Sequence, residues 1–246
     1  MRFIEDIEMR KQKLIPDKYR FLSGSTIKLI AVLTMLIDHT AGYFVPGGYV
    51  LFSIGSHNFM LYSIMRMIGR IAFPLFAFLL VEGFLHTRSR IRYGASLLIC
   101  AFISEIPWDL VHSGKLMSSG QNVFFTLTIG FLGMCAVEYL KDHPFFQLIA
   151  LAALAIVSVF IKSDYSIRGF IFIILLYALR EHEVLRILPS FILNNFIYTI
   201  AAFVPISFYN GKRGFIKGAV LKYAFYAFYP VHLLVFYFIR LANGYY

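Results

Sequence analysis

Several long apolar runs of this chain contain titratable side chains that could carry out proton transfer. Asp38 and His39 adjoin in the first run, Glu105 lies in the third and His232 in the last. An ionisable group inside a membrane span costs roughly 3 kcal/mol, so such groups are functional candidates by default. A carboxylate next to a histidine suits general acid–base catalysis, although two separately satisfied structural groups would leave the same pattern.

The first apolar run places small and polar residues on one helical face. Ala31, Thr34, Asp38 and Gly42 recur at spacings of three and four residues, so their side chains share a face of a helix. Such a face packs inside a bundle, because small residues let helices approach closely. His39 is turned about 100° from Asp38 around the helix axis. The two side chains therefore share a depth but not a direction.

Further polar groups are predicted at a similar depth. Asp109 lies one turn after Glu105, and Pro107 between them frees backbone groups that a site can use. Gln121 and Asn122 then open the next apolar run on the same, outer side. The sequence thus predicts a polar layer at or just beyond the middle of a membrane, built from distant parts of the chain.

The end of the second apolar run carries a charged rim. Glu82 and His86 are one turn apart on a helix, and Arg88, Arg90 and Arg92 follow. A pocket at this rim could hold phosphates. Arginines that extend along a membrane surface would give the same pattern.

Composition shows which elements must position these groups. Of the 246 residues, 59% are hydrophobic and 15% are charged, against about 25% charged in globular domains. The formal charge of +10 does not indicate nucleic acid, because the basic residues lie between apolar runs, as in membrane proteins. Cys100 and Cys135 lie in apolar runs, so neither a disulfide framework nor a metal cluster is expected. No signal peptide is evident.

We predict an all-α, polytopic transmembrane bundle of about eight spans in residues 27–246, preceded by a basic arm over residues 1–26. A span needs roughly 20 apolar residues. The expected spans are 27–45, 67–85, 93–111, 122–140, 145–161, 165–180, 185–207 and 220–241. The fifth and sixth are short and closely joined, so they form a tight hairpin or one crosses obliquely. Residues 46–65 are predicted to be interfacial or re-entrant.

Charge asymmetry predicts orientation. Six basic residues precede Lys28, and Arg88, Arg90 and Arg92 follow the second span, which places both termini in the cytoplasm. The basic loop 208–219 then falls on the outer side. Either the span count is off by one near residues 145–180, or this loop binds something anionic. The N-terminal arm is expected either to lie on the inner leaflet as an amphipathic helix or to be a solvated terminus.

Several of these runs closely resemble the TraX family, in the family's order along nearly the whole chain after residue 25. They are TMLIDH (34–39), GRIAFPLFAFLLVEGFLHT (69–87), ISEIPWDL (103–110), QNVFFTL (121–127), DY (164–165), YNGKRG (209–214) and FYAFYPVHLL (225–234). The family is associated with conjugative plasmids and N-terminal acetylation of pilin, and it is distantly similar to multi-span membrane acyltransferases. The resemblance implies a bacterial inner-membrane acetyltransferase. Its co-substrate would be cytoplasmic acetyl-CoA, and its acceptor a pilin, glycan, lipid or peptide.

The candidate residues suit acyl transfer. His39 or His232 could act as the base, oriented by Asp38 or Glu105. The remaining expected roles are grouped by chemistry: oxyanion stabilisation by Arg70, Asn122 or Tyr229; the donor at Glu82, His86, Arg88 and Arg92; and the acceptor at Asp109, Gln121, Lys212 and Arg213. No metal is expected, since the histidines lack a ligand-like spacing. A proton-coupled transporter and a non-catalytic membrane assembly subunit are the alternatives.

Overall fold

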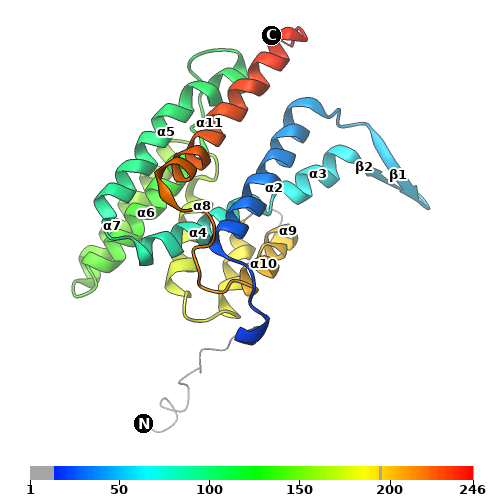
Figure 1. Cartoon of the computed structure of the whole chain (residues 1–246). Helices are drawn as coiled ribbons and strands as arrows, with labels where there is room; N and C mark the ends of the chain where they lie inside the picture. The colour runs from blue at the N-terminus through cyan, green and yellow to red at the C-terminus, as the bar shows by residue number, and fades with distance from the viewer. Residues whose placement is uncertain (1–13, 194–195, 246) are drawn as a thin grey trace.

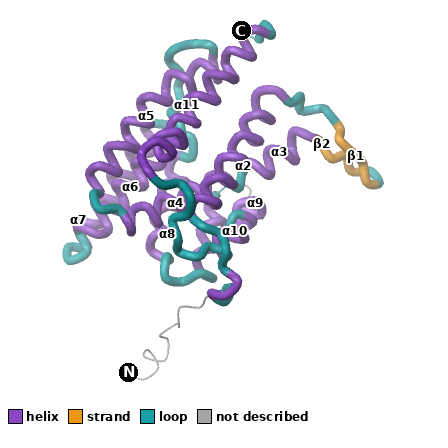
Figure 2. The backbone as a smooth tube through the Cα atoms, in the orientation of Figure 1, coloured by secondary structure: helices purple, strands orange, loops and turns teal. Residues whose placement is uncertain are grey.

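Long apolar helices dominate the computed structural model, which describes residues 14–193 and 196–245 (Figures 1 and 2). Most of the predicted N-terminal arm lies outside the described residues. The longer helices are α2 (Gly24–Phe44), α4 (Ala72–His86), α5 (Arg90–Ser113), α6 (Val123–Tyr139), α7 (Pro144–Phe160), α8 (Ser166–Ala178) and α11 (Gly218–Ala242). The shorter elements are η1 (Asp17–Tyr19), β1 (Val50–Ile54), β2 (His57–Met60), α3 (Leu61–Gly69), η2 (Leu185–Ile192), α9 (Phe196–Ala201) and α10 (Phe203–Ser207).

Four of the described segments are long and apolar enough to cross a membrane: α2, residues 61–86, α5 and most of α11. α2 illustrates why. Ser23 caps its N-terminus by accepting a hydrogen bond from the Thr26 N–H at 3.2 Å, which satisfies one of the free donors of the first turn. Its 21 residues rise about 31 Å, close to the thickness of the hydrocarbon layer.

α3 and α4 together correspond to the second predicted span, with a break at Arg70 and Ile71. Gly69 at the end of α3 is buried against Asp38 of α2, where any Cβ would collide with the carboxyl group. This close approach fixes α3 against the polar face of α2. The small-residue face predicted from sequence is therefore a helix-packing face, as expected.

α2, α5 and α11 all run in the same direction, so their C-terminal ends meet (Figure 1). Phe44 of α2 packs edge-on against Phe236 of α11 with ring centroids 4.9 Å apart, and Arg240 Nη1 donates to the Val111 carbonyl of α5 at 2.8 Å. Residues 14–23 lie at the other end of α2. If α2 crosses a membrane, residues 14–23 and the end of α11 lie on opposite sides of it. The side on which each terminus lies stays a prediction.

The region from 185 to 207, predicted to be a span, is broken into η2, α9 and α10. Pro189 lies within η2 and Pro205 within α10, and proline removes a helical hydrogen bond. The longest apolar helical stretch there, Tyr198–Ser207, rises only about 15 Å. This region is therefore not one continuous transmembrane helix, and the count of eight spans stays a prediction.

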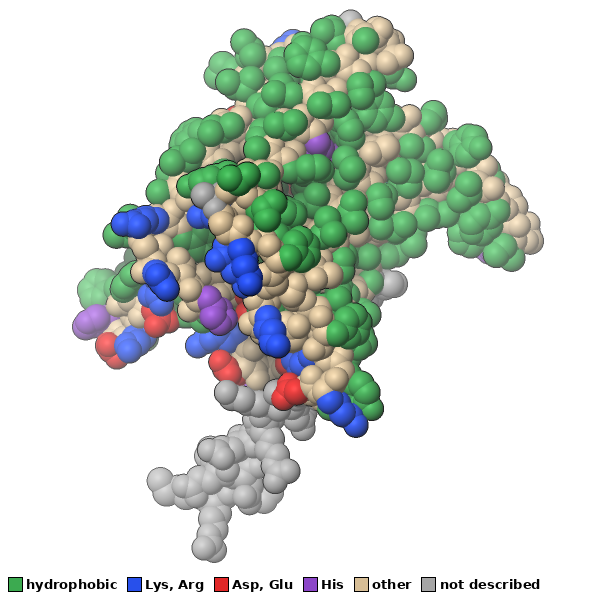
Figure 3. All heavy atoms as spheres, in the orientation of Figure 1, with side chains coloured by type: hydrophobic (Ala, Val, Ile, Leu, Met, Phe, Trp, Pro, Cys, Tyr) green, Lys and Arg blue, Asp and Glu red, His purple; other side chains and the backbone are tan. Residues whose placement is uncertain are grey.

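The basic loop 208–217 consequently returns to the N-terminal end of α2. The N–H groups of Gly24 and Ser25 donate to the carbonyls of Lys212 and Arg213 at 2.8 and 2.9 Å. The loop thus lies on the same side as residues 14–23, and its apparent conflict with the charge rule disappears. Figure 3 shows Lys and Arg side chains gathered at this end of the molecule, which we call the basic face, while apolar side chains cover the rest of the view.

Residues 46–65 form an antiparallel β-hairpin, β1–β2, followed by the start of α3. The hairpin projects sideways from the helices, beyond the N-terminal end of α3 (Figure 1), and Phe52 stacks on Phe59 with centroids 4.7 Å apart. The all-α prediction therefore missed one small sheet. The helices α7 and α8 do form a hairpin, and the Gln121 N–H donates to the Lys162 carbonyl in their connection at 3.2 Å.

Candidate functional site

A pair of histidines from α2 and α11 lies within the bundle. The rings of His39 and His232 are stacked with an interplanar angle of 10°, and His39 Nδ1 is 2.7 Å from His232 Nε2. The Tyr229 ring flanks both, with its centroid 6.2 Å from the His39 ring and 5.6 Å from the His232 ring. The structure therefore brings together both histidines that sequence analysis proposed as bases.

The hydrogen-bond chain determines which nitrogens carry hydrogen in the neutral pair. His232 Nδ1 is 2.8 Å from the Phe228 carbonyl, which can only accept, so Nδ1 carries the hydrogen. His232 Nε2 is then an acceptor, and His39 Nδ1 donates to it. His39 Nε2 is left with a free lone pair and has no hydrogen-bond partner among the described residues. His232 thus orients His39, and His39 Nε2 is the atom able to take a proton.

Asp38 does not orient either histidine. Its Oδ2 accepts a hydrogen bond from Arg66 Nη1 at 2.7 Å, and both side chains are largely buried. Arg70 lies further along, where it hydrogen-bonds Tyr165 beside Asp164. These groups form an ionic cluster next to the histidine pair, and the predicted Asp38–histidine pairing is wrong.

Glu105 also has a different partner from the one expected. Its Oε2 accepts hydrogen bonds from the side chain and backbone N–H of Asn122, at 2.5 and 3.3 Å. Asn122 in turn caps α6 by accepting from the Phe124 N–H at 3.0 Å. Glu105 therefore fixes the start of α6 against α5, and Asn122 uses its donors on Glu105 and the Ala101 carbonyl. Among the described residues, neither the Glu105 nor the Asn122 side chain hydrogen-bonds to His39 or His232.

A cavity of about 610 Å³ leads inward from the basic face. Gly24 and Ser25, at the start of α2, line its outer part, and Met35 and Tyr229 line it about three turns deeper. Tyr229 therefore forms the boundary between this cavity and the histidine pair. The Tyr229 side chain is 4% exposed, and its hydroxyl has no hydrogen-bond partner.

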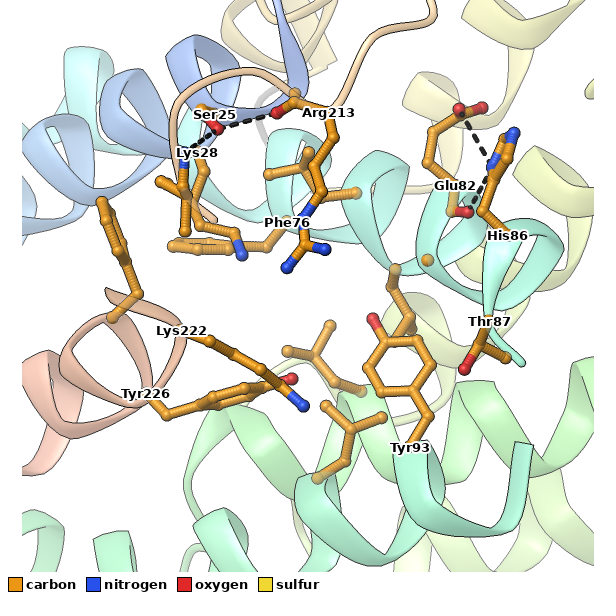
Figure 4. Close-up of a pocket in the computed structure, with 18 of the residues that line it drawn as sticks. Ser25, Lys28, Phe76, Glu82, His86, Thr87, Tyr93, Arg213, Lys222 and Tyr226 are labelled. Carbon is orange, nitrogen blue, oxygen red and sulfur yellow. Dashed lines mark hydrogen bonds and ion pairs between the residues drawn. The ribbon is translucent and has the colours of Figure 1, made fainter. Parts of the chain in front are cut away.

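All four residues predicted to bind the donor line this cavity: Glu82, His86, Arg88 and Arg92. Figure 4 shows Glu82 and His86 on one wall of it, where His86 Nδ1 lies 2.8 Å from the Glu82 carbonyl. Glu82 also hydrogen-bonds Tyr209, and burial together with this carboxylate raises the pKa of Tyr209. Their clustering agrees with the prediction, and their binding role stays a prediction.

The four residues predicted to bind the acceptor are not brought together. Asp109 is buried near the end of α5, where the Ser118 backbone N–H donates to it, and Gln121 pairs with the α7–α8 connection. Lys212 and Arg213 lie instead on the basic face, and Arg213 lines the donor-side cavity. They therefore lie at the same end of the molecule as residues 14–23, not at the opposite end as the sequence predicted.

Sequence analysis missed four charged residues of the cavity and of the ionic cluster beside the histidine pair. Lys28 and Lys222 line the cavity, Arg66 neutralises Asp38, and Asp164 lies beside Arg70. A second cavity of about 370 Å³ is lined by Arg70 and Asp164. The available signal was position: Lys28, Arg66 and Lys222 each lie inside or at the edge of an apolar run, where a charge needs a partner.

The fold and site define a polytopic helical protein suited to a membrane, with a basic cavity that ends beside a largely buried histidine pair. Residues 23–240 match the family described as TraX protein, and the chain belongs to this family. A relative from Dichelobacter nodosus, described as probable fimbrial assembly protein FimC, serogroup H1, is 29% identical over 243 residues. The match covers 86% of this chain and 93% of the relative. No solved structure matches the chain.

Proposed function

We propose that this protein is an integral membrane acetyltransferase that uses acetyl-CoA as donor and an amine or hydroxyl as acceptor. The observation that carries the proposal is the cavity that runs from the basic face to Tyr229, next to the His39–His232 pair. A base beside the inner end of a cationic cavity suits a donor with a phosphate-bearing head and a reactive thioester tail.

In this proposal the basic face lies in the cytoplasm of a bacterium, and the chain lies in the inner membrane. The positive-inside rule supports this orientation, since Lys and Arg cluster there. Acetyl-CoA then enters from the compartment in which it is made. The acceptor approaches from the other side or from within the membrane.

His39 Nε2 takes the proton from the acceptor as its nitrogen or oxygen attacks the thioester carbonyl. The new C–N or C–O bond forms, and the carbonyl becomes an oxyanion. The C–S bond then breaks, and the proton held by His39 passes to the departing thiolate, which leaves as free coenzyme A. His232 holds the His39 ring in the required tautomer through the 2.7 Å contact.

Tyr229 is the residue best placed to stabilise the oxyanion. Its hydroxyl is buried at the inner end of the cavity and has no protein partner. A buried hydroxyl without a partner costs free energy, and a carbonyl oxygen that gains charge would satisfy it. Arg70 and Asn122, the other expected oxyanion residues, are both engaged elsewhere.

The acceptor we favour is a pilus or fimbrial subunit. The relative from Dichelobacter nodosus is described as a probable fimbrial assembly protein. The association of the TraX family with pilin supports the same class of acceptor. A glycan or lipid of the cell envelope is the competing acceptor class. Candidate subunits, added singly to the purified protein with acetyl-CoA, would gain 42 Da if they are substrates.

A proton-coupled transporter is the alternative function, and the ionic cluster of Asp38, Arg66, Arg70 and Asp164 favours it, because charges within membrane spans also mark proton pathways. Purified protein in detergent should release free thiol from acetyl-CoA when an acceptor is present, and His39→Gln should abolish this release. Thiol release by the wild type at the background rate, with proton flux in proteoliposomes, would instead support the transporter.

A further inference from the structure

Three cations converge inside the cavity without a carboxylate among them. Lys28 comes from α2, Arg213 from the loop before α11 and Lys222 from α11, and Figure 4 shows their charged groups pointing into the same space. Lys28 lies close enough to the other two to be repelled by both. None of the three forms an ion pair with an acidic residue in the described part of the chain.

This wall differs from the opposite one. There, Glu82 supplies a negative charge 3.8 Å from His86, and Arg88 follows in the chain. On the wall formed by Lys28, Arg213 and Lys222, the neighbours are aromatic: Lys28 lies 5.7 Å from the Phe225 ring centroid. Like charges held together in a partly dry cavity repel strongly. An anion is needed to balance them.

We infer that Lys28, Arg213 and Lys222 bind the diphosphate group of the acetyl donor, which deepens the proposed function and rests on it. The shared chemistry is a phosphate-rich anion, which a soluble nucleotide thioester or an anionic lipid headgroup could supply. The spacing along two helices decides between these sources.

On both helices, the distance from the lysine to the histidine is close to the length of the arm that joins the diphosphate of coenzyme A to its thioester. Lys28 precedes His39 by eleven residues on α2, and Lys222 precedes His232 by ten on α11, which correspond to rises of about 16 and 15 Å. The arm of coenzyme A has about thirteen bonds between the diphosphate and the thioester carbonyl, and reaches roughly 15 Å when extended. A diphosphate at the three cations therefore brings the thioester to the level of Tyr229 and the histidines.

The test is a binding measurement on the full-length protein in detergent. Lys28→Gln and Lys222→Gln should each lower the affinity for coenzyme A and for inorganic pyrophosphate about tenfold or more, because each removes a charged hydrogen bond. Lys28→Arg and Lys222→Arg keep the charge and should retain most of the affinity. Lys217→Gln is the matched control, since Lys217 is exposed on the same face and does not line the cavity.

A truncated donor separates binding of the diphosphate from chemistry. Acetyl transfer from S-acetyl-N-acetylcysteamine, which lacks the diphosphate, should fall at least tenfold less in the two Gln variants than transfer from acetyl-CoA does. Unchanged coenzyme A affinity in both would overturn the inference. Loss of binding to short-chain phosphatidylglycerol added to the detergent-solubilised protein, with coenzyme A affinity intact, would assign the cations to a lipid headgroup and overturn it too. Wild-type protein that binds pyrophosphate through these lysines but transfers no acetyl group would refute the proposed function and leave the phosphate site standing.

Discussion

At the scale of single residues, the histidine pair gives a ranking of the two candidate bases. His39→Gln removes the free lone pair and should lower the rate of acetyl transfer by about 10² to 10⁴. His232→Gln places an amide oxygen near the position of Nε2, where it still accepts from His39 Nδ1, so its loss should be smaller. Steady-state rates of both variants, after each has been shown to be monodisperse in detergent, check this order. The reverse order would make His232 the base.

Tyr229 allows a second measurement at the same scale. Tyr229→Phe removes only a hydroxyl that has no protein partner, so the fold should keep its stability. If the hydroxyl stabilises the oxyanion, kcat should fall by about 10² or more while KM changes little. A rise in KM at constant kcat would show that Tyr229 only binds the donor.

Residue types predicted the histidine centre better than they predicted its partners. Sequence placed Asp38, His39, Glu105 and His232 at similar depth, and His39 and His232 do meet. The sequence could not predict that Arg66 pairs with Asp38 or that Asn122 pairs with Glu105. The depth of a residue along its own helix does not determine which residue of a neighbouring helix faces it. Rotation of the packed helices, which depends on contacts such as Gly69 against Asp38, decides that.

At the scale of elements, the contact between α2 and α3 depends on a glycine. Gly69→Ala would drive a methyl group into Asp38 and should lower the free energy of unfolding by about 1–3 kcal/mol, the usual cost of overpacking. The matched control is Gly42→Ala on α2, where the nearest atom, Arg66 Nη1, is 3.4 Å from the new Cβ. That variant should be neutral or more stable, since alanine favours helix. Thermal unfolding in detergent compares the two, and equal midpoints would contradict the packing argument.

A second element-scale prediction concerns the segment before α2. Arg20 Nη2 donates to Glu183 Oε2 at 2.7 Å, and their side chains are 11% and 12% exposed. Burial opposes ionisation of Glu183, yet hydrogen bonds from Arg20 and the Leu14 N–H lower its pKa below the ordinary value. Because the pKa of Glu183 is lower in the folded than in the unfolded protein, where it is about 4.3, its ionisation stabilises the fold at pH values above 4.3. This stability is lost as the pH falls through the pKa of the folded state.

The melting temperature of the wild type should therefore fall between pH 6 and pH 3.5 by more than that of Glu183→Gln. At pH 7 the variant should be less stable than the wild type, because Arg20 is left partly buried without its carboxylate. Glu181→Gln serves as the control, since Glu181 is 55% exposed in its pair with Arg180 and exposed pairs contribute little. If the melting temperatures of the wild type and Glu183→Gln fell in parallel with pH, the Arg20–Glu183 contact would not be the source of the pH dependence.

The elements themselves were largely predictable, and the exceptions have physical causes. Apolar length identified α2, α5, α6, α7, α8 and α11 within a few residues. Hydropathy alone did not separate the 185–207 region from a span, although Pro189 and Pro205 were visible there. The β-hairpin at 50–60 pairs a mainly apolar strand, β1, with the mixed strand β2, which contains His57 and Asn58. Neither strand shows the regular polar–apolar alternation that would have predicted it.

At the scale of the whole molecule, the path of the chain predicts its topology. Residues 14–23 and the loop 208–217 are hydrogen-bonded at the start of α2, and Tyr43 near its end lies 5.5 Å from the Arg240 guanidinium of α11. If α2 and α11 both cross the membrane, the C-terminus and the basic loop must lie on opposite sides. The basic loop belongs in the cytoplasm, because translocating several Lys and Arg residues is unfavourable.

Alkaline phosphatase fused after Tyr246 should therefore be active outside the cytoplasm, whereas a fusion at Gly211 should be inactive. A fluorescent protein that folds only in the cytoplasm should give the opposite result at each site. An insertion near Gly48, at the far end of α2, should behave like the C-terminal fusion and provides the internal control. If the reporters after Tyr246 and at Gly211 both behaved as cytoplasmic, α11 would not cross the membrane. The cavity could then not join the basic face to a histidine pair in the middle of the membrane. That outcome would remove the physical basis for passing an acetyl group across the bilayer.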